Sequence, residues 1–100
     1  MSFENVKSRI EKKLGDAKGL SGRFKFDFGD EGIIFVDTTQ TPALMSEKDE
    51  EADVTFETTT STFKGILDGT QDPTMAFMMG KLKVRGSMGL AMKLNSFLED

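Results

Sequence analysis

Ser61 and Lys64 stand three positions apart, in the S-x-x-K spacing that lets a lysine one helical turn away activate a serine nucleophile. The companion motifs S-D-N and K-T-G do not occur in the 100 residues, and a four-letter pattern of this kind often arises by chance. We therefore interpret Ser61 as the N-cap of a helix whose lysine faces water. A serine hydrolase is kept as an alternative that ester turnover by Ser61→Ala would test.

The sequence contains few residues that could support other catalytic chemistry or bind a metal. The sequence has no Cys and no His, which removes thiolate chemistry, the usual acid–base group near neutral pH and the commonest metal ligand. The acidic run EKDEEAD lacks the ligand spacing and central glycine of an EF-hand, and no glycine-rich nucleotide motif occurs. With a net charge of −4 and no basic stripe, nucleic acid is a poor partner. We expect no catalysis, no metal, no cofactor and no nucleic acid.

The methionines are the remaining candidates for a site. Met75, Met78 and Met79 follow i, i+3, i+4 spacing on one helical face, while Met88 and Met92 are i, i+4 on a later helix. An apolar stripe at helical spacing is usually ordinary core. Methionine, however, specifies a packed core poorly and recurs on surfaces that adapt to varied apolar partners. The stripes are thus either core or a soft apolar wall.

The elements that would position these residues follow from periodicity, because helices repeat every 3.6 residues and strands every two. A composition of 37% hydrophobic residues with nine phenylalanines fits one folded domain spanning residues 1–100. Phe3, Val6, Ile10 and Leu14 predict an amphipathic helix ended by Gly15. The further predicted elements are strands at 23–28 and 33–37 joined as a hairpin by GDEG, a short edge strand in 41–46, a strand at 52–58, helices at about 61–69 and 73–79, a strand at 81–86 and a helix from Ser87 onward.

Strands grouped early and helices grouped late predict an α+β layer in which helices cover one face of a mostly antiparallel sheet. No segment approaches the roughly 20 apolar residues of a membrane span, and the N-terminus lacks the apolar stretch of a secretory signal. We expect a cytoplasmic protein. Its basic N-terminal helix is either a solvated face or a surface that meets anionic lipid headgroups.

Two stretches, ADVTFETTTSTFKGILDGTQDP and AFMMGKLKVRGSMGLAMKL, resemble the signature of the sterol carrier protein 2 domain family. The matching features include the strand from Ala52, the Asp72-Pro73 helix start and the run Gly80 to Val84. The similarity is strong from Ala52 onward and holds by pattern alone before it. The sequence looks like a stand-alone bacterial form of this family.

The resemblance implies a five-stranded sheet with helices over one side, enclosing an apolar tunnel. Family members are non-catalytic carriers of fatty acid, fatty acyl-CoA, sterol or phospholipid, and the same function is implied for this chain. The alternative is an accessory domain that presents hydrophobic substrates to a partner enzyme or regulates it. Carried over by position, the tunnel wall would comprise Phe35, Phe56, Phe63, Leu67, Met75, Met78, Met79, Leu82, Met88, Leu90 and Met92.

The basic residues of the first helix are then expected to serve that function. We expect Lys7, Arg9, Lys12 and Lys13 to contact a ligand headgroup or to make transient contact with an anionic membrane. The chain ends in Leu-Glu-Asp rather than the peroxisomal tripeptide of animal members, which argues against peroxisomal import. The sequence discloses neither the natural lipid nor the oligomeric state.

Overall fold

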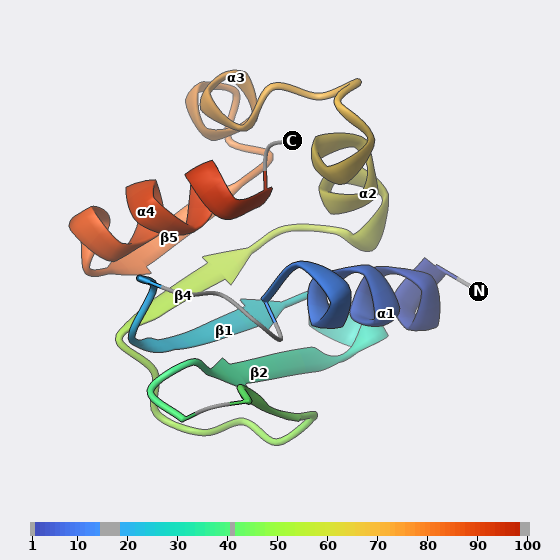
Figure 1. Ribbon diagram of the computed structural model, residues 1–100. Coiled ribbons are helices and arrows are strands. Elements are labelled where there is room, and N and C mark those ends of the chain that lie inside the picture. The colour runs from blue at the N-terminus through green and yellow to red at the C-terminus, as the bar shows by residue number, and fades with distance from the viewer. Residues whose placement is uncertain (1, 15–18, 41, 99–100) are drawn as a thin grey trace.

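The computed structural model describes residues 2–14, 19–40 and 42–98. Figure 1 shows their arrangement as a sheet with helices. In chain order the elements are α1 (Ser2–Leu14), β1 (Arg23–Asp27), a 3₁₀ turn (Gly29–Glu31), β2 (Ile33–Asp37), β3 (Leu44–Ser46), β4 (Val54–Glu57), α2 (Thr60–Asp68), α3 (Pro73–Met78), β5 (Lys83–Gly86) and α4 (Met88–Leu98). Each predicted helix and strand is present. Gly15, the predicted end of the first helix, lies outside the described residues.

The five strands form one sheet in the order β3-β2-β1-β4-β5. Three of the four strand pairs are antiparallel, and β1 pairs with β4 in parallel. The helices pack on one face of this sheet (Figure 1). The expected α+β fold, with a five-stranded and mostly antiparallel sheet, is therefore confirmed.

The covered face of the sheet carries the core. Phe24 and Phe26 alternate with charged residues along β1 and point towards the helices, where they are fully buried. The ring of Phe26 stacks on Phe56 at a centroid distance of 5.3 Å and meets Phe63 of α2 at 5.2 Å. Aromatic pairs at such distances add to the free energy gained by burying their area. This contact fixes α2 over the centre of the sheet.

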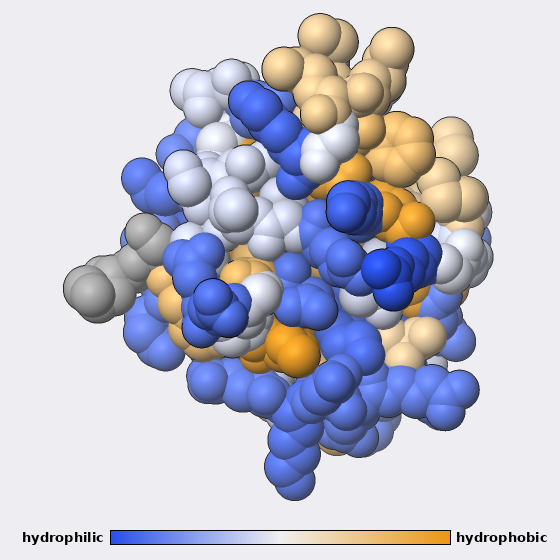
Figure 2. All heavy atoms as spheres, turned by 180° about the vertical axis from the view of Figure 1, so that it is seen from behind, coloured by the Kyte–Doolittle hydropathy of each residue, from blue (hydrophilic) through white to orange (hydrophobic). Residues whose placement is uncertain are grey.

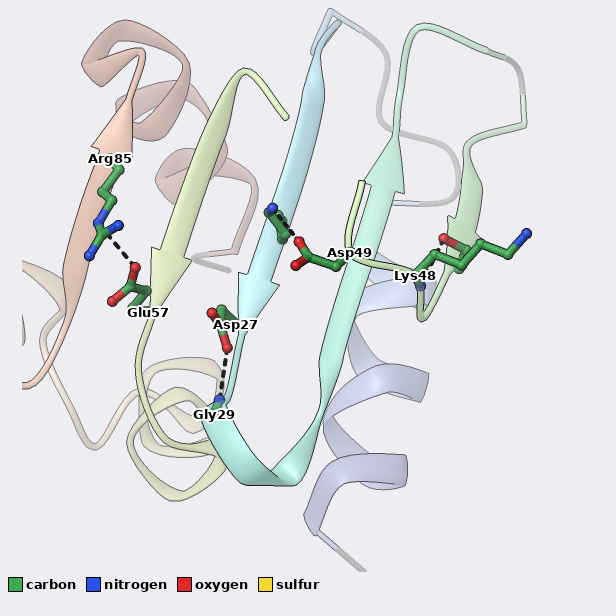
Figure 3. A network of polar contacts seen from close by, with 8 residues as sticks. Asp27, Gly29, Lys48, Asp49, Glu57 and Arg85 are labelled. Atoms are coloured by element: carbon green, nitrogen blue, oxygen red, sulfur yellow. Dashed lines mark hydrogen bonds and ion pairs between the residues drawn. The ribbon is translucent and has the colours of Figure 1, made fainter. Parts of the chain in front are cut away.

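The opposite face of the sheet is polar and carries ion pairs between neighbouring segments (Figure 3). Lys25 Nζ lies 2.6 Å from Asp49 Oδ1, and Arg85 Nε lies 3.0 Å from Glu57 Oε2. Exposed pairs of this type contribute little stability each. Phe35 also belongs to this face, because it lies opposite Lys25 in the β1–β2 register. The expectation that Phe35 belongs to the same apolar wall as Phe56 is therefore wrong, because the two side chains lie on opposite faces of the sheet.

Local capping largely follows the sequence. Asp72 accepts a hydrogen bond from the Thr74 N–H and Pro73 occupies the first turn of α3, as predicted. Helix α2, in contrast, is capped by Thr59, whose hydroxyl accepts from the Thr62 N–H, and Ser61 lies inside the helix. The prediction that Ser61 caps this helix is wrong. The helix begins at Thr60, so Thr59, with its extended backbone, is the capping residue.

Two features are missing from the part of the chain that the structure describes. None of its helices combines the length and the apolar character needed to cross a bilayer. Its carboxylates also form no group of three or more that could hold a metal ion.

Candidate functional site

An open groove of about 360 Å³ lies between α3, α4 and the β4–β5 edge of the sheet. Its volume falls within the range of about 300 to 1,000 Å³ that is typical of small-molecule sites. Helices α3 and α4, strands β4 and β5 and the residue that precedes β5 contribute its walls. The lining residues are Phe56, Leu82 and Val84 from the sheet side, Pro73, Thr74 and Phe77 from α3, and Met88, Ala91, Met92, Asn95 and Ser96 from α4.

A smaller space of about 30 Å³ shares lining residues with this groove and lies deeper in the molecule. Phe63 and Ile66 of α2 and Leu94 of α4 close its inner end. All three are buried members of the hydrophobic core. The groove therefore leads from the surface towards the contact between α2, α4 and the sheet.

The α3 wall is held by hydrogen bonds around Ala76. The backbone N–H groups of Lys81 and Leu82 both donate to the Ala76 carbonyl, at N···O distances of 2.9 and 3.1 Å. This turn brings the chain back under the helix and buries Leu82. Pro73 and Phe77, at i and i+4, then face the groove from the same side of α3.

The α4 wall is held at its start by Asp53, the residue that precedes β4. The Ser87 N–H donates to the Asp53 carbonyl at 2.9 Å, and the Ser87 hydroxyl accepts from the Leu90 N–H at 3.2 Å. Ser87 thus caps α4 as predicted. From this start, Met88, Ala91, Met92 and Asn95 follow helical spacing and line the groove.

The groove is uncharged along the residues that the structure describes. Its polar groups are the side chains of Thr74, Asn95 and Ser96, and the rest of the lining is aliphatic, aromatic or thioether. Such a surface favours an apolar ligand and leaves a few polar groups to orient it. The two side chains whose pKa departs from its ordinary value lie outside the groove. The hydrogen bond from Lys7 to Glu47 raises the pKa of Lys7, and the hydrogen bond from the Thr39 hydroxyl lowers the pKa of Asp37.

Ten of the eleven predicted wall residues divide into three groups, and the eleventh, Phe35, lies on the open face of the sheet. Phe56, Leu82, Met88 and Met92 line the groove, and Phe63 lines the deeper space. Two more are packed elsewhere: Leu67 is a buried core residue of α2, and Leu90 lies against Gly22. The last group, Met75, Met78 and Met79, is exposed and does not line either space.

The sequence reasoning missed Phe77 and the helix face opposite to the three methionines. Helix α3 packs through Ala76, which is fully buried, so the side bearing Met75, Met78 and Met79 faces solvent. The i, i+4 pair of Pro73 and Phe77 was the available signal for the groove side of this helix. A six-residue helix with an apolar residue on every side does not reveal by itself which side packs.

The basic residues of α1 lie apart from the groove. Lys7 and Arg9 form ion pairs of 2.5 Å with Glu47 and Asp68. Helix α1 packs beside α2 over the β1–β2 part of the sheet, whereas the groove lies at the β4–β5 edge (Figure 1). Lys12 is exposed and Lys13 half-buried on the same helix.

The S-x-x-K pair also lies outside the groove. Ser61 is exposed on α2, and Lys64 Nζ lies 3.9 Å from Asp68 Oδ2 one turn further along the helix. Neither residue lines the groove or the deeper space.

The fold and groove together define a small α+β module with an uncharged apolar site beside its last two helices. The chain belongs to the SCP-2 sterol transfer family, whose model matches residues 3–99. Human sterol carrier protein 2 is 35% identical over 102 residues, which cover 91% of this chain and 19% of that protein. Human hydroxysteroid dehydrogenase-like protein 2 is 33% identical over 99 residues, which cover 97% of this chain. The chain spans 24% of that relative's length.

Solved structures share the whole fold. A solution structure of palmitated SCP2L2 from Aedes aegypti matches with a TM-score of 0.75 and 25% identity, covering 100% of this chain and 96% of that one. Sterol carrier protein 2 from the same organism, in complex with palmitate, matches with a TM-score of 0.80 and 20% identity over 99% of this chain and 96% of that one. The second likeness concerns the fold alone.

Proposed function

We propose that this chain is a non-catalytic lipid carrier that holds an acyl chain in the groove between α3, α4 and the β4–β5 edge. The observation that carries the proposal is the groove itself, whose lining is apolar and uncharged and leads inward to the core. Membership of the SCP-2 sterol transfer family supports it. So does the similarity of the chain to palmitated SCP2L2 from Aedes aegypti.

The energetics of such a site are favourable without a specific polar contact. Burying a 16-carbon acyl chain provides roughly 10 kcal/mol at about 0.8 kcal/mol per methylene, before association costs are subtracted. Micromolar binding corresponds to about 8 kcal/mol. Apolar burial is therefore of the magnitude that micromolar binding requires, and the net affinity depends on how much of the acyl chain the groove covers.

The lining residues divide the work of holding the ligand. Phe56 and Leu82 supply a fixed floor, because both are buried. Met88 and Met92 supply a wall whose unbranched side chains adjust to ligands of different width. Asn95 and Ser96 are the polar side chains of the α4 wall, and we place a carboxylate or hydroxyl of the ligand on that side of the groove.

The ligand class that we favour is a straight acyl chain, as free fatty acid or acyl-CoA. Sterol and phospholipid remain within the proposal. The alternative of an accessory domain that presents lipids to an enzyme uses the same groove, and its one supporting observation is the greater length of the hydroxysteroid dehydrogenase-like relatives. The cytoplasmic location and the stand-alone form stay predictions.

Thermal unfolding with and without ligand tests the proposal. A ligand that binds only the folded chain at 100 times its Kd adds about 2.7 kcal/mol of stability. For a domain of about 100 residues each kcal/mol raises Tm by roughly 4 to 8 °C. Palmitate, oleoyl-CoA and cholesterol are each titrated below their solubility limits. A Tm that stays constant with all three would overturn the proposed function.

A further inference from the structure

All of the sulfur in this chain is thioether, because the sequence has seven methionines and no cysteine. The structure describes six of these methionines, of which Met45 is half-buried in β3. The other five are exposed and belong to α3, its C-cap and α4: Met75, Met78, Met79, Met88 and Met92. Figure 2 shows apolar side chains gathered at the end of the molecule that these two helices form. Along the described residues, an oxidant in solution therefore reaches methionine chiefly at this end.

Two of these methionines also line the groove. Met88 and Met92 stand at i, i+4 on α4, keep 50% and 72% of their surface accessible and form part of the α4 wall. Neither belongs to the buried core of the fold. Oxidation of these two side chains therefore alters the surface that contacts a ligand and spares the packing that holds the helices on the sheet.

Oxidation makes an apolar methionine side chain polar. A sulfoxide carries an S–O dipole that accepts hydrogen bonds, whereas the thioether is apolar and flexible. An acyl chain laid against a sulfoxide removes water from its oxygen and offers no donor in exchange, which is unfavourable. The polar side chains of the lining are those of Thr74, Asn95 and Ser96, and the rest of the lining offers no side-chain donor either. A groove whose α4 wall is oxidised therefore holds an acyl chain less tightly.

We propose that Met88 and Met92 are oxidation sites at which hydrogen peroxide lowers the affinity of the groove for an acyl chain. This inference rests on the proposed function, because it concerns regulation of the same groove. The thioether sulfur attacks one oxygen of the peroxide, so that an S–O bond forms as the O–O bond breaks. Sulfur loses two electrons and the peroxide gains them. The proton on the transferred oxygen passes to the departing hydroxide, which leaves as water.

The modification is reversible where the sulfoxide stays accessible. Two classes of methionine sulfoxide reductase, one for each epimer at sulfur, restore the thioether. Two thiols of the reductant become a disulfide, and the sulfoxide oxygen leaves as water. Because Met88 and Met92 are half or more exposed, a reductase reaches them without unfolding the chain. The carrier thus holds acyl chains in its reduced form and releases them in its oxidised form.

The methionines of α3 and its C-cap provide an internal comparison. Met78 and Met79 are exposed to a similar degree, at 74% and 60%, but line neither the groove nor the deeper space. Peroxide oxidises them as well, yet their sulfoxides lie away from a bound acyl chain. The affinity for the ligand should therefore follow the conversion of Met88 and Met92 and not the total sulfoxide content of the protein.

Peroxide treatment with site-resolved mass spectrometry tests the inference. The protein is oxidised with hydrogen peroxide, freed of it by gel filtration and digested to measure the sulfoxide fraction at each methionine. Displacement of a fluorescent fatty acid by palmitate gives the affinity, which should fall at least about tenfold once Met88 and Met92 are converted. Both reductases with dithiothreitol should restore it. Dithiothreitol alone is the control, because the chain has no cysteine on which it could act.

Two double variants assign the effect to the groove. Met88→Leu/Met92→Leu removes the two groove thioethers, and Met78→Leu/Met79→Leu removes two exposed thioethers outside it. Each variant is compared with itself before and after peroxide treatment, so a difference in starting affinity cancels. Peroxide should leave the affinity of the first variant unchanged and lower that of the second at least about tenfold. Equal losses in both variants, or a loss confined to the first, would overturn the assignment.

The outcomes separate this inference from the proposed function. Wild-type protein that binds palmitate equally before and after full conversion of Met88 and Met92 disproves the inference alone. So does peroxide that converts Met78 and Met79 but spares the two groove methionines, and so does a loss of affinity that the reductases do not reverse. Reduced protein whose Tm stays constant with palmitate, oleoyl-CoA and cholesterol disproves the carrier function, and the oxidation inference falls with it.

Discussion

Met92 and Met78 are exposed to nearly the same extent, at 72% and 74%, but Met92 lines the groove and Met78 does not. A carboxylate at position 92 would place a charge beside a bound acyl chain, which disfavours the complex. Met92→Glu should therefore weaken palmitate binding at least about tenfold while changing Tm of the ligand-free protein little. Fluorescent fatty-acid displacement measures the affinity.

Met78→Glu is the matched control for that experiment. It introduces the same charge at the same degree of exposure, on the solvent side of α3. Its affinity for palmitate should equal that of the wild type. Equal losses in the two variants would show that the groove between α3 and α4 is not the binding site.

Asp37 gives a residue-scale prediction about pH. Its pKa is lowered chiefly by the hydrogen bond from the Thr39 hydroxyl, with the Thr39 backbone N–H donating as well. A carboxyl whose folded pKa lies below the unfolded value of about 3.9 stabilises the fold above that pH. This contribution is lost as the pH falls through the folded pKa.

Thr39→Ala should raise the pKa of Asp37 towards its ordinary value and move the acid loss of stability to higher pH. An NMR titration of the Asp37 carboxyl measures the first effect. Thr70→Ala, whose wild-type hydroxyl donates to the Gly65 carbonyl, is the control that should leave the Asp37 titration unchanged. A pKa that is the same in Thr39→Ala and wild type would contradict the assigned cause.

At the scale of elements, Gly86 fixes the junction between β5 and α4. Its φ is +100°, and a Cβ at this position would lie 2.3 Å from the Asp53 carbonyl oxygen. Gly86→Ala must therefore move β5 away from β4 or strain the backbone. We expect a loss of roughly 2 to 4 kcal/mol in the free energy of unfolding, measured by urea denaturation.

Gly80 provides the comparison. Its φ of +76° is also in the left-handed region, but a Cβ there would meet nothing within 4 Å. Gly80→Ala should cost only about 1 to 2 kcal/mol, the ordinary penalty of that conformation. Equal losses in the free energy of unfolding for Gly86→Ala and Gly80→Ala would contradict the argument that the close approach of Gly86 to the Asp53 carbonyl stabilises the fold.

The elements themselves were predictable because their signals are local. Asp72, Pro73 and Ser87 fix the starts of α3 and α4 through contacts within one helical turn. The alternation of Phe24 and Phe26 with charged residues indicates which side of β1 is buried. The sequence did not predict which side of β2 and which side of α3 are buried. In β2 the apolar residues are consecutive, so only pairing with β1 places Phe35 on the polar face of the sheet.

Helix α3 shows the same limit at the site. Periodicity correctly grouped Met75, Met78 and Met79 on one face, but packing through Ala76 turns that face outward. Which side of a short apolar helix is buried depends on residues distant in sequence, here the floor formed by Phe56 and Leu82. The prediction therefore found Met88 and Met92 of the α4 wall and missed Phe77 of the α3 wall.

For the whole molecule, the polar and apolar surfaces are segregated. The open face of the sheet carries ion pairs (Figure 3), whereas apolar side chains gather at the end formed by α3 and α4 (Figure 2). The groove lies between the same two helices and the sheet. A carrier needs a stable framework and one adaptable surface. The Phe26, Phe56 and Phe63 ring cluster supplies the framework, and the methionines supply the surface.

The methionine methyl groups allow the central claim to be tested directly. Palmitate is titrated into protein labelled with ¹³C at its methionine methyls, and the resonances are followed by NMR. The account predicts saturable shifts and ligand contacts at Met88 and Met92, with Met45 at the opposite edge of the sheet unchanged. Saturable palmitate binding that leaves Met88 and Met92 unshifted, or that shifts Met45 instead, would contradict it.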